Sequence, residues 1–133
     1  MQQTPIAVIG TGSIGTRHLK VLRGVDGMRT LAVPLRPERI AELTRQGYAA
    51  CRDLGATAAQ GARHAIVATD TRRHVADAES ALALNMAVLV EKPLASDANV
   101  AYALLRRAAH VGLPLFVGCV LRFSKTINEF RAQ

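Results

Sequence analysis

The stretch Ile6-Ala-Val-Ile-Gly-Thr-Gly-Ser-Ile-Gly15 carries the clearest structural signal, because a short apolar segment leads directly into a G-x-G-x-x-G motif. Apolar residues over 6–10 without alternation predict a strand buried on both faces, as in a parallel sheet. From Ser13 to Arg23 the apolar positions fall on one helical stripe, and Gly24 marks the stop. The chain therefore opens with a strand, a glycine turn and a helix, which presents free backbone N–H groups to phosphate.

Strands and helices alternate along the rest of the chain. Further strands are predicted over 30–35, 49–52, 64–69, 87–90 and 115–118, and helices over 37–47, 72–84, 97–110 and 124–131. Alternation with short connections predicts parallel strands joined by right-handed crossovers. The expected fold is a single α/β domain with an open, doubly wound parallel sheet, the Rossmann fold.

Composition and charge exclude several classes of protein. Half of the 133 residues are hydrophobic and 20% are charged, which excludes intrinsic disorder. The formal net charge of +7 comes from scattered basic residues, and aromatics are only 4% with no Trp. We interpret this as a solvated basic surface, with anion binding at one defined site left open and no nucleic-acid partner expected.

The cysteines and the first residues of the chain indicate in which cellular compartment the protein is expected. Cys51 and Cys119 match neither a redox pair nor a zinc cluster. The first residues lack the pattern of a signal peptide, and no apolar run approaches the ~18 residues of a membrane span. We therefore expect a cytoplasmic protein with reduced cysteines and no membrane partner.

Each glycine of the turn has its own expected role. Gly10 permits the tight turn, Gly12 lets a pyrophosphate approach bare backbone, and Gly15 lets the helix pack on the strand. The alternatives are a plain tight turn and a site for S-adenosylmethionine, as in methyltransferases. The position of the motif, directly after a buried strand and before a helix, favours the dinucleotide interpretation.

The end of the second predicted strand bears on which ligand the turn would bind. In dinucleotide sites an acidic residue at this place usually holds the ribose hydroxyls, whereas an arginine suits a 2′-phosphate. Here the strand ends Val33-Pro-Leu-Arg36, with Arg39 close behind and no carboxylate at that end. This favours NADP over NAD, with Arg36 in the cofactor site, and counts against S-adenosylmethionine. The alternative for Arg36 is a solvated loop charge.

A second motif, Val88-Leu-Val-Glu91-Lys92-Pro93-Leu94, places a carboxylate, an ammonium group and a proline at the carboxyl end of a predicted strand. Open α/β sheets bind their ligands at that end. Together, Gly10-Thr-Gly-Ser-Ile-Gly-Thr-Arg-His18 and this E-K-P resemble the glucose-fructose oxidoreductase, inositol dehydrogenase and rhizopine catabolism (Gfo/Idh/MocA) family of NAD(P)-dependent oxidoreductases. The resemblance covers essentially the whole chain, as the N-terminal dinucleotide-binding domain of that family.

The resemblance implies roles for individual residues. Lys92 is the expected catalytic residue, since it would reach the hydroxyl on the substrate carbon and help move a proton while hydride passes to the nicotinamide. The alternative for Lys92 is an exposed strand-end lysine paired with its neighbour. Pro93 would set the turn, for which a cis bond is one option. The implied cofactor-binding residues are Gly10, Gly12, Ser13, Ile14 and Gly15 at the pyrophosphate, Thr69, Asp70 and Thr71 along the cofactor with His74 nearby, and Glu91, Lys92 and Pro93 at the nicotinamide ribose.

The resemblance also implies a domain organisation. Residues 1–120 would form the NAD(P)-binding domain, and 121–133, which contain the family's R-F step at Arg122-Phe123, would begin the connection to a C-terminal substrate domain. Family members carry that second α/β domain, and we expect this chain to be either a fragment or one half of a split enzyme that lacks it. We therefore expect either a partner chain that supplies it or self-association of this chain.

The main functional hypothesis is the nucleotide-binding domain of an oxidoreductase that transfers hydride to or from a sugar, cyclitol or related hydroxy or keto substrate. The alternatives are a non-enzymatic NAD(P)-binding sensor or subunit and an S-adenosylmethionine-binding, methyltransferase-like domain. No metal site is expected. His18, His64 and His110 lack partners at metal-ligand spacing and are interpreted as surface or helix-end residues.

Overall fold

A six-stranded sheet of parallel strands forms the centre of the structure, a computed structural model that describes residues 3–132. The strand order is β3-β2-β1-β4-β5-β6, so the chain reverses its direction of travel across the sheet between β1 and β4. Such a reversal leaves a crevice at the carboxyl ends of the strands. The strands are β1 (Thr4–Ile9), β2 (Met28–Val33), β3 (Ala49–Ala50), β4 (His64–Val67), β5 (Ala87–Glu91) and β6 (Leu115–Gly118).

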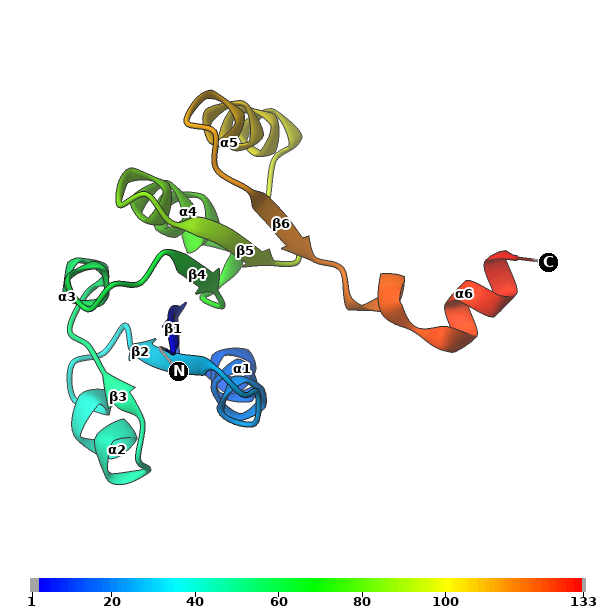
Figure 1. Ribbon diagram of the computed structural model, residues 1–133. Helices are drawn as coiled ribbons and strands as arrows, with labels where there is room; N and C mark the ends of the chain where they lie inside the picture. The colour runs from blue at the N-terminus through cyan, green and yellow to red at the C-terminus, as the bar shows by residue number, and fades with distance from the viewer. Residues whose placement is uncertain (1–2, 133) are drawn as a thin grey trace.

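Helices cover both faces of the sheet (Figure 1). The helices are α1 (Ser13–Arg23), α2 (Arg39–Arg45), α3 (Leu54–Ala59), α4 (His74–Ala83), α5 (Ala98–His110) and α6 (Lys125–Arg131), with short 3-10 turns at Thr71–Arg73 and Val120–Phe123. Helices α3, α4 and α5 pack on one face, and α1 and α2 on the other. Helix α6 projects away from this body at the end of the chain (Figure 1).

The core is divided between the two faces because neighbouring strand residues point to opposite sides. Ala7 and Ile9 of β1 pack toward α4 and α5, whereas Val8 packs toward α1. The central strands are therefore apolar without alternation, as a parallel sheet covered on both faces requires. The doubly wound parallel fold expected from the sequence is confirmed.

The predicted and observed boundaries of helices and strands agree best where a specific residue fixes the end of the element. Helix α1 matches its prediction in full, and the predicted start of α5 is fixed by Asp97, which accepts hydrogen bonds from the first turn. The helix expected over 72–84 is a 3-10 turn followed by α4, since Asp70 caps the turn first. Helix α3 was not predicted, because its sequence LGATAA carries no apolar stripe, and the cap at Asp53 stabilises it instead.

The two cysteines are free and lie in different surroundings. Cys51 is buried beside β3, where its sulfur accepts a hydrogen bond from Gln60, and burial raises the pKa of its thiol. Cys119 is exposed after β6. Within residues 3–132, no helix has the length and apolar character needed to span a membrane, and no three His, Cys, Asp or Glu side chains gather as metal ligands.

Candidate nucleotide-binding site

A cavity of about 610 Å³ lies at the carboxyl ends of β1, β2 and β4, at the point where the strand order reverses. This is the place where doubly wound sheets bind ligands. Six of the residues predicted for the cofactor line it. The remaining lining residues come from the glycine turn, from α1, from the turn after β2, from the start of α2 and from the end of β4. The lining residues are Gly10, Thr11, Gly12, Ser13, Thr16, Lys20, Leu35, Arg36, Arg39, Ala68, Thr69 and Asp70.

The geometry at Gly10 and Gly15 agrees with the tight turn and the close helix packing expected from the motif. Gly10 has a φ of +85°, and a Cβ atom there would lie 2.8 Å from the carbonyl oxygen of Ala68. A Cβ on buried Gly15 would collide with the carbonyl oxygen of Gly10, so only glycine lets α1 pack this closely on the turn. Gly12 is exposed, with open space where its side chain would be. Bare backbone therefore faces the cavity at Gly12.

The amino end of α1 is left open toward a ligand. Gly12 is the residue before the helix and has no side chain to accept hydrogen bonds from the first turn. The N–H groups at the start of a helix have no partner within it, and together they carry a partial positive charge. Ser13 and exposed Ile14 lie in this first turn. The arrangement fits the diphosphate of a dinucleotide.

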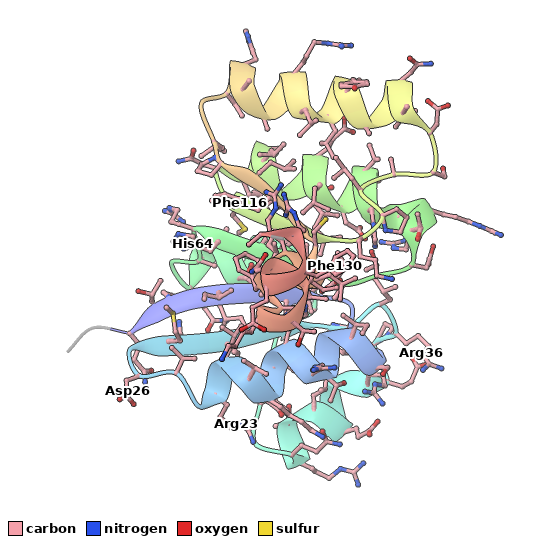
Figure 2. The ribbon with its side chains drawn as sticks, turned by 90° about the vertical axis from the view of Figure 1, so that its right-hand side faces the viewer. Arg23, Asp26, Arg36, His64, Phe116 and Phe130 are labelled. Atoms are coloured by element: carbon pink, nitrogen blue, oxygen red, sulfur yellow. The ribbon has the colours of Figure 1, made fainter. Side chains whose placement is uncertain are left out.

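Three basic side chains surround the far side of the cavity. Arg39 donates to the carbonyl oxygen of Thr11 at 2.9 Å and pairs with Glu42 at 2.9 Å, so it braces the glycine turn. Arg36 extends toward solvent from the turn after β2 (Figure 2). Lys20 was not predicted, although its helical spacing of seven residues from Ser13 would have placed it on the same face of α1. Asp70 is the one acid among the lining residues.

Thr69 at the end of β4 is held by neighbouring groups of the protein. Its hydroxyl donates to Asp77 on α4 at 2.8 Å, and Arg73 donates to the other oxygen of Asp77 at 2.9 Å. The carbonyl oxygen of Thr69 lies 3.1 Å from Nε2 of His74. His74 is only 2% exposed and does not line the cavity, and neither does Thr71. Thr69 therefore lines the cavity, and Arg73, His74 and Asp77 support it from behind.

The E-K-P motif lies at the end of β5, beside this cavity and outside its lining. Lys92 and Pro93 are exposed, and the peptide bond between them is cis. Glu91 points to the α1 side of the sheet, where its carboxylate lies 2.7 Å from Nε2 of His18. His18 is thus a half-buried partner of the motif rather than a surface residue.

A second cavity, of about 640 Å³, lies on the α1 side of β5 and β6 and is mostly apolar. The His18–Glu91 pair forms one end of it, and Phe116 of β6 forms part of its wall. The surface continues along the end of the chain, where Phe123 is 83% exposed. Phe116 and Phe130, labelled in Figure 2, are exposed as well. This apolar face is defined by Phe116, Val120, Leu121, Phe123, Ile127 and Phe130.

Comparison with known proteins identifies the domain. Residues 4–119 match the family described as "Oxidoreductase family, NAD-binding Rossmann fold" under the name Gfo/Idh/MocA. The chain belongs to the Gfo/Idh/MocA family. It is therefore an NAD(P)-binding Rossmann domain of a family of NAD(P)-dependent oxidoreductases, as the sequence predicts.

Relatives of this Gfo/Idh/MocA chain include inositol and sugar-nucleotide dehydrogenases. It is 32% identical over 131 residues to "Myo-inositol dehydrogenase Hyg17" of Streptomyces leeuwenhoekii, covering 96% of this chain and 40% of the relative. "Inositol 2-dehydrogenase" of Rhodococcus erythropolis is 29% identical, with 98% of this chain and 39% of the relative covered. Among solved structures, "UDP-N-acetylglucosamine 3-dehydrogenase GnnA" of Acidithiobacillus ferrooxidans is 27% identical with a TM-score of 0.84, over 99% of this chain and 43% of that one. The chain thus spans about 40% of the length of its curated relatives.

Proposed function

We propose that this chain is the cofactor-binding part of an oxidoreductase that transfers hydride between NADP and a sugar, cyclitol or related hydroxy or keto compound. The cavity over the glycine turn carries the proposal. Bare backbone at Gly12, the open amino end of α1 and the turn at Gly10 fit a diphosphate. The inositol and sugar-nucleotide dehydrogenases among the relatives support the substrate class.

The preference for NADP follows from the charges at the adenosine side of the cavity. Arg36 and Lys20 line it, and Leu35 stands near the end of β2, where NAD-binding domains usually present a carboxylate. Arg39 is already bonded to Thr11 and Glu42, which leaves Arg36 as the best placed guanidinium for a 2′-phosphate. Arginine suits phosphate because its planar fork can donate two parallel hydrogen bonds.

Lys92 is the proposed catalytic residue. A bound nicotinamide supplies or accepts the hydride at the substrate carbon. The Lys92 ammonium group would donate a proton to the oxygen on that carbon during reduction, and the neutral amine would accept it during oxidation. Lys92 is exposed, as is needed for a group that must reach a substrate outside this domain.

Calorimetric titration with NADP, NAD and S-adenosylmethionine tests the cofactor proposal. Wild type should bind NADP most tightly. Arg36→Ala should reduce NADP affinity about tenfold and leave NAD affinity unchanged, because only NADP carries the 2′-phosphate. Arg45→Ala removes the same charge from an exposed site on α2 and serves as the control. Equal affinities for NADP and NAD would refute the preference, and S-adenosylmethionine as the only ligand would refute the oxidoreductase assignment.

We further propose that residues 1–120 form the cofactor domain, that 121–133 begin the connection to a substrate domain, and that this domain covers the apolar face. Exposed aromatic side chains over β6, the turn at Val120–Phe123 and α6 support this, since large exposed apolar surfaces mark interaction sites. Light scattering with and without a separately expressed substrate domain tests it. A stable heterodimer with restored turnover is expected, whereas a homodimer that excludes the added domain would assign the face to a second copy.

The cellular setting follows from the thiols. Two free cysteines, one of them exposed, suit a reducing compartment, so we propose that the protein acts in the cytoplasm.

A further inference from the structure

We propose that two histidines from opposite helical layers, His18 on α1 and His74 on α4, hold the E-K-P turn from both sides and thereby position Lys92. The role in catalysis rests on the proposed function of Lys92. The holding of the turn is a separate physical statement, because it concerns contacts within this chain. We call His18 and His74 the histidine clamp.

The first half of the clamp joins α1 to the residue before Lys92. Nε2 of His18 lies 2.7 Å from Oε1 of Glu91, although the two residues are 73 positions apart. The side chains are only 25% and 16% exposed, so water screens their interaction less than on an open surface. A carboxylate only accepts hydrogen bonds, so Nε2 is the donor. Glu91 is also confined on its other side, since a Cβ on Gly118 would lie 3.2 Å from its carboxylate.

The second half joins α4 to the residue after Lys92. Nδ1 of His74 lies 2.7 Å from the carbonyl oxygen of Pro93, and Nε2 lies 3.1 Å from the carbonyl oxygen of Thr69. Both partners accept, so a neutral imidazole can donate to only one of them at a time and an imidazolium to both. A side chain with no N–H at this position would leave the carbonyl oxygens of Pro93 and Thr69 without the imidazole donor. The ring therefore fits a bridge between the loops that follow β4 and β5.

The two contacts flank a single residue. Glu91 precedes Lys92 and Pro93 follows it, and their partners come from the helices on opposite faces of the sheet. The same helices shape the nucleotide cavity, α1 through its first turn and α4 through Asp77, which accepts a hydrogen bond from the cavity residue Thr69. The clamp therefore fixes Lys92 relative to the cavity. Precise placement of a proton donor matters because small displacements reduce reaction rates strongly.

Asparagine and glutamine distinguish the two contacts by geometry. The amide nitrogen of asparagine is attached to Cγ, as Nδ1 of histidine is, whereas that of glutamine is one atom further out, as Nε2 is. His18 uses Nε2 toward Glu91, so His18→Gln should keep the contact and His18→Asn should lose it. His74 uses Nδ1 toward Pro93, so His74→Asn should keep that contact and His74→Gln should lose it. The rescuing amide is thus opposite at the two positions.

Backbone ¹⁵N relaxation of the apo chain at Glu91, Lys92 and Leu94 measures the clamp directly. Order parameters near about 0.85 are expected in wild type, His18→Gln and His74→Asn, with a drop toward about 0.6 in His18→Asn and His74→Gln. Leu82→Ala, which removes a core side chain of α4, controls for general loss of stability. Equal order parameters for the Asn and Gln variants at both positions would overturn the proposal.

Affinity for ligands separates the clamp from the proposed function. The loosened variants should bind the whole dinucleotide at least about threefold more weakly and bind 2′,5′-ADP as wild type does, because the turn lies outside the adenosine side of the cavity. Equal loss of both ligands would contradict a role confined to the turn. If wild type binds no dinucleotide, the proposed function fails while the relaxation result still decides the clamp.

Discussion

Helices α1 and α5, which pack against the same sheet, begin in two different ways. At α5, Asp97 accepts hydrogen bonds from the N–H groups of Asn99 and Val100 at 2.9 and 3.1 Å. At α1 the corresponding residue is Gly12, which has no side chain, and the first turn faces the cavity. Helix α5 has a side-chain acceptor for the N–H groups of its first turn, whereas α1 has none.

The third residue of the first turn also differs between the two helices, in how deeply it is buried. Gly15 in α1 is buried against the backbone of Gly10, whereas Val100 in α5 is exposed. Helix α1 is thus packed tightly at its base, Gly15, and open at its tip, Gly12. Helix α5 is exposed at its base, Val100, and capped at its tip by Asp97. The free energy of unfolding and the affinity for ligand should therefore respond differently to substitutions at the start of α1 and at the start of α5.

The largest expected effect comes from filling the base of α1. Gly15→Ala would force the new Cβ into the carbonyl of Gly10, and we expect a loss of about 3 kcal/mol in the free energy of unfolding. Val100→Ala, the matched change in α5, should cost less than about 0.5 kcal/mol because the side chain is exposed. Urea denaturation measures both. Similar losses for the two variants would show that packing at the base does not distinguish these helices.

The next effect comes from giving α1 the cap that α5 has. Gly12→Asp should weaken dinucleotide binding about 100-fold, because the carboxylate would occupy the first-turn N–H groups and repel phosphate. The free energy of unfolding should rise by a few tenths of a kcal/mol, since open space surrounds this position. Calorimetric titration and urea denaturation of one preparation give both numbers. Unchanged affinity would mean that the diphosphate does not bind at this helix end.

The smallest effect comes from removing the cap of α5. Asp97→Ala should lower the free energy of unfolding by about 1 kcal/mol, because the N–H groups of Asn99 and Val100 lose their acceptor. Dinucleotide affinity should stay the same, since α5 does not line the cavity. The same pair of measurements applies. A loss of affinity here would indicate that the amino end of α5 also contributes to the site.

Local sequence was sufficient to predict the structure where the elements that build it are contiguous in the chain. The strand, glycine turn and helix over 6–23 are contiguous, so their period and glycine spacing contain the geometry that the structure shows. The same holds for Arg36, which follows directly on a strand end. That these residues bind cofactor stays a prediction until a nucleotide is titrated.

Local sequence was insufficient where a contact joins distant elements. Nothing near His18 predicts Glu91, because the pair depends on α1 and β5 meeting across the sheet. His74 was expected near the cofactor, but it is buried behind the wall, since its ring binds the carbonyls of Thr69 and Pro93. Helix α3 was missed for a different reason, because small residues with a capping aspartate leave no apolar period to detect.

The different surroundings of the two cysteines make the chain a one-thiol protein for chemical labelling. Burial raises the pKa of Cys51 and lowers its thiolate fraction at neutral pH, so it should react slowly with maleimides. Cys119 is exposed and lines the second cavity together with Glu91 and Phe116. A fluorophore attached there, without any engineered cysteine, would stand at the edge of the apolar face. Its emission would report the arrival of a covering domain in real time.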